Sequence, residues 1–333
     1  MPERKRVLTG DRPTGKLHLG HYVGSLANRI ALQDEHDLFL LVANLHALTT
    51  KTDTANQLEN IHTLVLDQLA AGIDPEKATF YLQSDVPEIA ELGVILSMLV
   101  THSMATNVPT LKEVLRDLNI ESPSMGLIVY PVLMAADILI GKAHVVPVGK
   151  DQTSHLELAR EVARRFNTTY GDMFPVPEAL IPKDSGTLPG LDGKAKMSKS
   201  LGNDIKLSDD PATVEAKVME MYTDPNHVHV NDPGSVEGNV VFTFLDIFDV
   251  NKAEVADLKE HYRKGGLGDV VIKKRLAAVL NEFLEPMRAR RAELEKNPDQ
   301  IKEVLRAGTE KMRLIARATL EEVKEKMRIN YLA

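Results

Sequence analysis

The chain has 333 residues, of which 43% are hydrophobic and 26% charged, and its formal net charge is −8. These values fit an ordinary soluble globular protein with one large and one smaller domain. It contains no cysteine, which excludes disulfides, thiolate metal sites, iron–sulfur clusters and a thiol nucleophile. The longest apolar stretches, at 38–43 and 94–100, are too short to span a bilayer, and the N-terminus lacks the apolar core of a secretory signal. We therefore expect a cytoplasmic protein with no membrane partner.

Strands and helices alternate over the first half of the chain. Strands are predicted at 4–10, 38–42, 78–82 and 145–148, and helices at 20–33, from a capping Asp53 to about 71, at 87–100 and at 152–166. This alternation predicts an α/β fold with a Rossmann-like doubly wound parallel sheet. Residues 101–143 form a largely helical insertion.

The second half is predicted to be helical. Four glycines interrupt residues 182–203, which are therefore interpreted as a loop. A helix is predicted to start at Asp210, because the Pro that follows suits a first helical turn, and residues 300–328 carry apolar side chains at helical spacing. We expect two domains, 1–205 and 206–333, with a last helix that can pack back on the first domain.

One block of sequence, at 9–21, lies between the first strand and the first helix, where α/β folds bind nucleotides. It nearly matches a P-loop, but Leu17 stands where Ser or Thr should bind Mg²⁺. A second interpretation is that His18 and His21 share one face of a helix start. Gly20 would then let a phosphate approach the backbone, and the helix N-terminus would attract it. Two surface histidines at a helix cap are the alternative.

A second block carries Lys194, Lys196 and Lys199 within the glycine-rich loop. Ammonium groups are compact charges suited to phosphates, and a flexible loop can close over a triphosphate. A solvated lysine loop is the alternative. The presence of both blocks in one chain favours an ATP site held from two sides.

The two blocks together resemble the signatures of class I aminoacyl-tRNA synthetases. Residues 18–21 (HLGH) are similar to the HIGH motif, and residues 196–200 match KMSKS letter for letter. The resemblance implies activation of an amino acid by ATP and transfer to tRNA. It also implies Mg²⁺ bound with ATP and mostly by water, with no dedicated protein metal site. The catalytic residues would be His18, His21, Lys196 and Lys199.

The segment 130–139 places Tyr130, Met134 and Asp137 on one face of a helix that Pro131 is predicted to begin. Asp137 lies among apolar residues and is expected to be buried, where a carboxylate is costly unless it is paired. A donor on a substrate would satisfy it, and so would a structural bond to backbone or to an arginine.

In this context the segment resembles tryptophanyl-tRNA synthetases. The resemblance implies that Asp137 accepts the indole N–H, that Met134 packs on the ring, and that Tyr130 and Gln152 bind the α-amino group, with His46 lining the pocket. The partners would be L-tryptophan, ATP and tRNA(Trp). Tyrosyl enzymes, the nearest relatives, usually carry Gln where this chain has Met134, which favours tryptophan.

The resemblance also implies an ATP site, with Asp151 at the ribose and Leu188 on the adenine. Its residues would be Arg12, Pro13, Thr14, Gly20, His21, Gly149, Lys150, Asp151, Leu188, Lys196, Met197, Ser198, Lys199 and Ser200. Many bacterial members read Thr-Ile-Gly-Asn where this chain has His-Leu-Gly-His, and Gln where Arg12 stands. These differences indicate a divergent branch with an additional positive charge near the triphosphate.

The tRNA is expected to bind the helical second half. Residues 251–333 hold 19 Lys and Arg against 14 Asp and Glu, and the basic side chains at 273–275, 288, 290 and 291 could contact tRNA phosphates. The insertion at 101–143 resembles the family's dimerisation region, which implies a homodimer. A tyrosyl-tRNA synthetase, a nucleotidyltransferase of the same fold and an auxiliary or non-catalytic paralogue remain alternatives.

Overall fold

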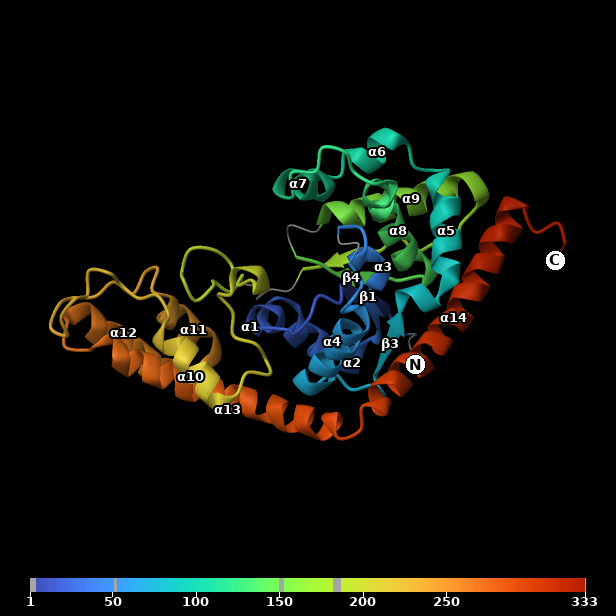
Figure 1. Cartoon of the computed structure of the whole chain (residues 1–333). Coiled ribbons are helices and arrows are strands. Elements are labelled where there is room, and N and C mark those ends of the chain that lie inside the picture. Colours follow the sequence, from blue (N-terminus) through green and yellow to red (C-terminus); the bar gives the residue numbers. More distant parts are fainter. Residues whose placement is uncertain (1–3, 51–52, 150–152, 182–186, 333) are drawn as a thin grey trace.

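Five parallel strands form one sheet in the computed structural model, which describes residues 4–50, 53–149, 153–181 and 187–332. The strands are β1 (Arg6–Asp11), β2 (Asp37–Val42), β3 (Ala78–Leu82), β4 (Val145–Pro147) and β5 (Glu178–Leu180). Their order is β3-β2-β1-β4-β5, so the predicted Rossmann-like doubly wound class is confirmed (Figure 1). Strand β5 is not predicted from the sequence, because its three residues are largely exposed and show no run or alternation of apolar side chains.

The sheet is buried on both faces because successive residues of each strand point to opposite sides. Val7, Leu38, Leu40 and Phe80 belong to one apolar core, and Leu8, Phe39, Leu41 and Tyr81 belong to the other. Gly10 lies close to β2, since a Cβ there would be 2.5 Å from the carbonyl oxygen of Leu41. The end of β1 is therefore packed tightly against β2, which fixes the position of the first residue of the loop after β1.

Helices cover both faces of the sheet. One face is covered by α4 (Gln57–Ala71) and by a continuous run of α1 (Leu19–His21), the π-turn η1 (Tyr22–Leu26) and α2 (Ala27–Glu35). The other is covered by α5 (Pro87–Ser97), α8 (Met125–Ile140) and α9 (Thr153–Tyr170). The insertion holds α6 (His102–Thr106) and α7 (Pro109–Asp117), which lie at the top of Figure 1 with α8 below them.

Two predicted helix starts are wrong. Asp53 accepts a hydrogen bond from the Ala55 N–H (2.9 Å) and does not cap α4, which begins at Gln57. Pro131 lies inside α8 instead of in its first turn, because the Ser124 side chain accepts the hydrogen bond that caps this helix. Asp137 is therefore held in the middle of a long helix and not near its end.

The second half of the chain holds five helices within the described residues. They are α10 (Pro211–Met219), whose start at Asp210 is confirmed, α11 (Val240–Phe248), α12 (Lys252–Lys264), α13 (Asp269–Glu295) and α14 (Asp299–Met327). Figure 1 shows α10 to α12 beside the α/β part, and α13 leading from them back toward the sheet. Among the described helices, none is long and apolar enough to cross a membrane.

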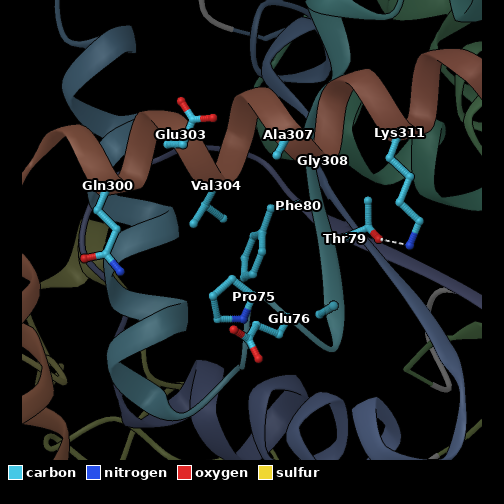
Figure 2. A pocket seen from close by; sticks show the side chains of 11 residues that line it. Pro75, Glu76, Thr79, Phe80, Gln300, Glu303, Val304, Ala307, Gly308 and Lys311 are labelled. Atoms are coloured by element: carbon cyan, nitrogen blue, oxygen red, sulfur yellow. Dashed lines mark hydrogen bonds between the residues drawn. The ribbon is translucent and has the colours of Figure 1, made fainter.

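The last helix, α14, covers the open edge of β3. The Leu82 N–H donates to Thr309 Oγ1 (3.1 Å), and Lys311 Nζ donates to Thr79 Oγ1 (2.9 Å). Gly308 faces the main chain of the strand, and Figure 2 shows this contact above Phe80. A sheet edge left open offers unpaired backbone groups to other chains. The helix thus closes the sheet on the side away from both sequence blocks.

We expect Gly308→Ala to destabilise the protein, although Ala is normally the better helix former. A Cβ at position 308 would lie 1.9 Å from the Phe80 carbonyl oxygen, so helix and strand must separate. The free energy of unfolding should fall by about 1–3 kcal/mol, the usual cost of overpacking, as measured by urea unfolding. Gly24→Ala is the control, since a Cβ there meets no atom within 4 Å. Equal stability of both variants would contradict the tight contact.

Candidate functional site

The first block forms the loop between β1 and α1, at the carboxyl edge of the sheet. β1 pairs with β2 on one side and with β4 on the other, which makes this the point where the order of strands reverses and where such sheets bind ligands. Asp11 anchors the start of the loop, because it accepts hydrogen bonds from Arg29 (3.0 Å) and Gln68 (2.7 Å). Burial opposes ionisation of Asp11, but the Arg29 guanidinium lowers its pKa.

The two histidine rings of the block lie against each other at the start of α1, with centroids 3.8 Å apart and planes tilted by 45°. The His18 N–H donates to His21 Nδ1 (3.1 Å), so in the neutral ring the proton of His21 is on Nε2. Burial lowers the pKa of His18 to about 3 and that of His21 to about 4. Both rings are therefore neutral near pH 7. Each can donate one hydrogen bond to an anion without itself carrying charge.

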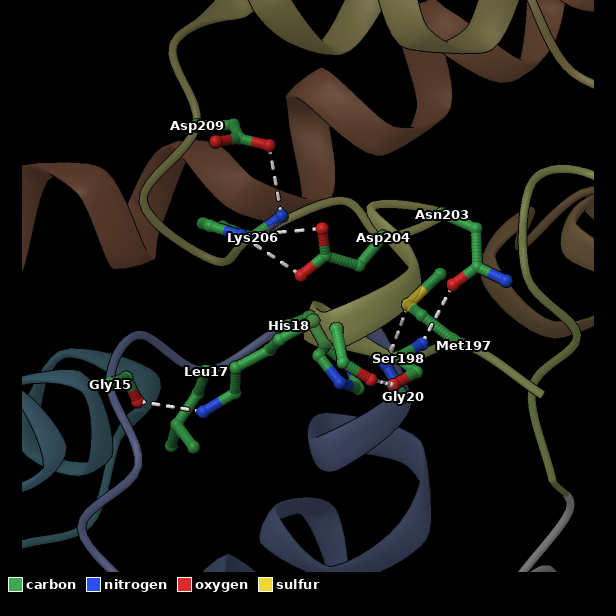
Figure 3. Close-up of polar contacts among 12 residues, drawn as sticks. Gly15, Leu17, His18, Gly20, Met197, Ser198, Asn203, Asp204, Lys206 and Asp209 are labelled. Atoms are coloured by element: carbon green, nitrogen blue, oxygen red, sulfur yellow. Dashed lines mark hydrogen bonds and ion pairs between the residues drawn. The ribbon is translucent and has the colours of Figure 1, made fainter. Parts of the chain in front are cut away.

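The second block is docked directly on the first. The Leu19 N–H donates to the Ile205 carbonyl and the Leu207 N–H donates to the Leu17 carbonyl, each at 2.9 Å. Gly20 contributes as well, since its N–H lies 3.4 Å from Met197 Sδ (Figure 3). Segments separated by almost two hundred residues in sequence thus form one surface.

Within the second block, Lys199 contacts the first block. Lys199 Nζ donates to the Gly15 carbonyl (2.8 Å) and to Thr14 Oγ1 (3.2 Å), and burial lowers the pKa of this lysine. Lys196 is exposed, so its charge lies outside this contact. The ammonium group of Lys199 lies on the loop that the sequence predicts to hold phosphate.

Among the other described residues of the predicted ATP site, some are buried and others are exposed. Met197 and Leu188 are buried in the apolar core, and the Met197 N–H donates to the Leu188 carbonyl (3.0 Å). The hydroxyls of Ser198 and Ser200 lie 3.0 Å apart. Pro13 is buried, Arg12 and Thr14 are exposed, and Gly149 follows β4 at a half-buried position. Lys150, Asp151 and Gln152 lie outside the described residues.

Asp137 lies at the bottom of a second group of polar side chains, and only 2% of its surface is exposed. Gln83 Nε2 donates to both of its oxygens (2.9 Å each), and His46 Nε2 lies 2.8 Å from Oδ2. Gln83 also accepts the N–H groups of Leu45 and His46 at the start of α3 (Asn44–Ala47). The described partners of the Asp137 carboxyl group are therefore a glutamine and a histidine, and not the backbone group or arginine of the structural alternative.

Tyr130 and Met134 lie on the same helix as Asp137, both half-buried against the core. The Tyr130 ring is perpendicular to that of His46, with centroids 6.3 Å apart, and its hydroxyl lies 3.4 Å from Thr110 Oγ1. Burial raises the pKa of Tyr130, and the charge of Arg12 opposes this rise. Asp137, His46 and Tyr130 thus lie close together, and Met134 lies on the same helix as Asp137 and Tyr130.

Two residues near Asp137, Gln83 and Tyr81, are not predicted from the sequence. Gln83 begins η2 (Gln83–Asp85) directly after β3, and a polar residue at the carboxyl end of a parallel strand is a signal that could have found it. Tyr81 is fully buried, and its hydroxyl has no hydrogen-bond partner among the described residues. Burial and the nearby Asp137 raise its pKa well above the ordinary value.

The basic side chains expected to meet tRNA are largely engaged inside the molecule. Arg288 donates to the Asp209 carbonyl (3.2 Å), Arg290 to the Ala70 carbonyl (2.7 Å), and Arg291 pairs with Asp67. Lys273 donates to the Met219 carbonyl, and Arg275 pairs with Asp249 and Glu254. Lys274 is exposed. Most of this basic run therefore fastens α13 to its surroundings.

The chain belongs to the class I tRNA synthetases of tryptophan and tyrosine (W and Y), whose family pattern matches residues 2–285. It is 54% identical to the tryptophan–tRNA ligase of Treponema pallidum over 325 residues, which are 97% of this chain and 96% of that protein. The tryptophan–tRNA ligase of Chlamydia caviae is 50% identical over 97% of this chain and 95% of that protein. A crystal structure of tryptophanyl-tRNA synthetase from Campylobacter jejuni, complexed with ADP and tryptophan, superposes with a TM-score of 0.87 at 35% identity, covering 97% of this chain and 99% of that one.

The neutral histidines predict a pH dependence of stability. Their folded pKa values of about 3 and 4 lie below the ordinary value of 6.5, so the unfolded chain binds more protons and stability falls as the pH drops from about 6.5 toward 4. Urea unfolding of the His18→Gln/His21→Gln variant should therefore show a smaller loss between pH 7 and pH 5, by on the order of 1 kcal/mol per histidine. Identical losses in wild type and variant would mean that the two rings are not held neutral.

Proposed function

We propose that this chain activates L-tryptophan with ATP and transfers it to tRNA(Trp), and that the two docked blocks and the Asp137 group carry the first step. Family membership and about 50% identity to tryptophan–tRNA ligases over nearly the whole chain support the overall reaction. The observation that carries the assignment of residues is the contact between the blocks. Lys199 Nζ lies 2.8 Å from the Gly15 carbonyl, beside the turn of His18 and His21.

The first step is attack of the tryptophan carboxylate on the α-phosphorus of ATP. A new P–O bond forms to the carboxylate, and the bond to the leaving pyrophosphate breaks. The carboxylate is already ionised at neutral pH, so positioning and stabilisation of charge suffice and no general base is needed. The neutral His21 would donate from Nε2 to a phosphate oxygen, and His18 would support it from the adjacent turn. Lys199, with Lys196 after loop closure, would follow the pyrophosphate.

The Asp137 group has one acceptor position left for a substrate. A carboxylate offers about four lone-pair sites. Gln83 uses one on each oxygen, and His46 uses a second on Oδ2. The remaining site is on Oδ1, where it can accept the indole N–H. Met134 supplies a soft, polarizable wall for a large ring, while the Gln of tyrosyl enzymes would bring a second polar group into the pocket.

The ATP contacts of Arg12, Pro13, Thr14, Gly20, Gly149 and the 196–200 segment remain proposals from the family resemblance, as do those of Lys150, Asp151 and Gln152. Mg²⁺ bound with ATP would neutralise phosphate charge. The donors that face the loop are imidazole and ammonium groups, which suit phosphate oxygens, whereas Mg²⁺ prefers oxygen ligands and water. We therefore assign the ion to the phosphates and not to a protein cage.

A homodimer is part of the proposal. Large apolar side chains are exposed on α5 and on the insertion beside it: Val94 is 61% exposed, Met98 73%, Leu118 53% and Met125 69%. Val94 lies on α5 and Met125 on α8, which pack together, while Met98 directly follows α5 and Leu118 directly follows α7, which contacts α8. Exposed apolar clusters of this kind are typical of protein interfaces. We place the twofold contact here, the tRNA on the helical second half, and the protein in the cytoplasm.

The decisive experiment is ATP–pyrophosphate exchange with each amino acid in turn. We expect exchange with tryptophan, and a rate with tyrosine lower by several orders of magnitude, because the pocket offers Asp137 and Met134 and no polar partner for a phenol at position 134. Exchange with tyrosine instead would identify the tyrosyl alternative. Exchange with none, together with nucleotide transfer to another substrate, would favour the nucleotidyltransferase.

Replacement of Lys199 should slow adenylate formation. We expect Lys199→Ala to lower the exchange rate about 100-fold, by analogy with the loss of one donor to a transition-state oxyanion, and to change the KM for tryptophan little. Lys194→Ala is the matched control, because Lys194 is an exposed lysine on the same loop. Similar rates for both variants would remove Lys199 from the reaction.

A further inference from the structure

Asp67 is a buried carboxylate outside the two sequence blocks. It lies on α4, and its surface is 1% exposed. One oxygen, Oδ2, accepts the N–H of Leu17 at 2.7 Å. The other, Oδ1, pairs with the Arg291 guanidinium of α13. Burial raises the pKa of Asp67, and the Leu17 N–H and the Arg291 guanidinium oppose this rise. Asp67 therefore joins the main chain of the first block to a cation of α13.

The loop that Asp67 holds is also the loop that holds Lys199. Leu17 is next to His18 and two residues from Gly15, whose carbonyl accepts the Lys199 ammonium group at 2.8 Å. The Leu17 carbonyl receives the Leu207 N–H from the segment after the second block. Lys199, Leu207 and Asp67 therefore all contact residues 14–17, and Asp67 links this loop to α13 through Arg291.

The helix α13 makes two further contacts on the same side. The Phe283 ring meets that of Tyr22 edge to face, with centroids 4.9 Å apart, and Arg290 Nε donates to the Ala70 carbonyl at 2.7 Å. Tyr22 directly follows His21. Helix α13 is thus fixed both to α4, through Asp67 and Ala70, and to the helical run that begins at the histidines.

We propose that Asp67 and Arg291 are positioning residues for ATP: through the Leu17 N–H they lock the phosphate-facing loop 14–17 to helix α13, so that the loop holds its ATP-binding shape only when α13 is seated. This inference rests on the proposed function of the two blocks. In this proposal Arg291 acts inside the molecule by pairing with Asp67, whereas its charge alone indicates a contact with tRNA.

The test uses the full-length protein and the variants Arg291→Gln, Asp67→Asn and Arg291→Lys. Arg291→Gln should raise the KM for ATP in pyrophosphate exchange about tenfold or more, while the KM for tryptophan stays within twofold. Arg291→Lys should recover part of the loss, because it restores the charge but not the planar fork. Combining Arg291→Gln with Asp67→Asn should add little further loss, since both act through one pair.

A second measurement does not depend on activity. Hydrogen exchange of the Leu17 amide should become faster in Arg291→Gln, and also in Asp67→Asn if the charge of Asp67 is what orders the loop. Arg263→Gln is the matched control, because Arg263 forms a surface pair with Glu237 (2.9 Å) in the helical second half. It should leave both the KM for ATP and the Leu17 amide unchanged.

The outcomes separate this inference from the function on which it rests. If the wild type showed no ATP–pyrophosphate exchange with tryptophan, the proposed function would be overturned. Protection of the Leu17 amide against hydrogen exchange would still report on the Asp67–Arg291 pair. An unchanged KM for ATP and unchanged amide exchange in Arg291→Gln would overturn the inference. A loss of stability with equal changes in the KM of both substrates would also overturn it, because that pattern is expected of a purely structural pair.

Discussion

Two backbone hydrogen bonds, from Leu19 to Ile205 and from Leu207 to Leu17, join the halves of the site. Backbone pairing fixes direction and distance more strictly than a contact between long side chains, because it leaves no rotamers free. Lys199 can therefore reach Gly15 although its loop is rich in glycine. Asp204 and Lys206, which pair at 3.0 Å on the same short segment, keep its charges satisfied while it lies against the histidines (Figure 3).

The two halves of the site use electrostatics in opposite ways. Around the histidines, burial keeps the rings neutral, so the positive charge beside them comes from Lys199, whose ammonium group donates to the Gly15 carbonyl. Around Asp137, Gln83 and His46 hold the buried carboxyl group by hydrogen bonds to both of its oxygens.

The sequence predicts the sheet, the order of its main helices and the two motifs, since these depend on local patterns of period two and 3.6 and on short signatures. It also predicts that Asp137 is buried near Tyr130 and Met134, because all three lie on one helix. It does not predict Gln83 or Asp67, whose roles depend on partners from distant segments. The predicted start of α8 at Pro131 is wrong for a local reason. Ser124 caps the helix seven residues earlier, and Pro131 lies within it.

The path of α13 decides what the basic side chains at 288, 290 and 291 contact. An arginine on an amphipathic helix carries the same sequence signal whether it faces tRNA or the protein, and only the path of α13 decides between them. Here α13 returns from the helical half to α4, which brings Arg291 to a carboxylate that already holds the Leu17 N–H. One guanidinium thus pairs with a buried carboxylate and fastens α13 to α4, beside the loop that the same carboxylate contacts. The role of an arginine such as Arg291 therefore depends on its tertiary contacts and not on the composition of the segment around it.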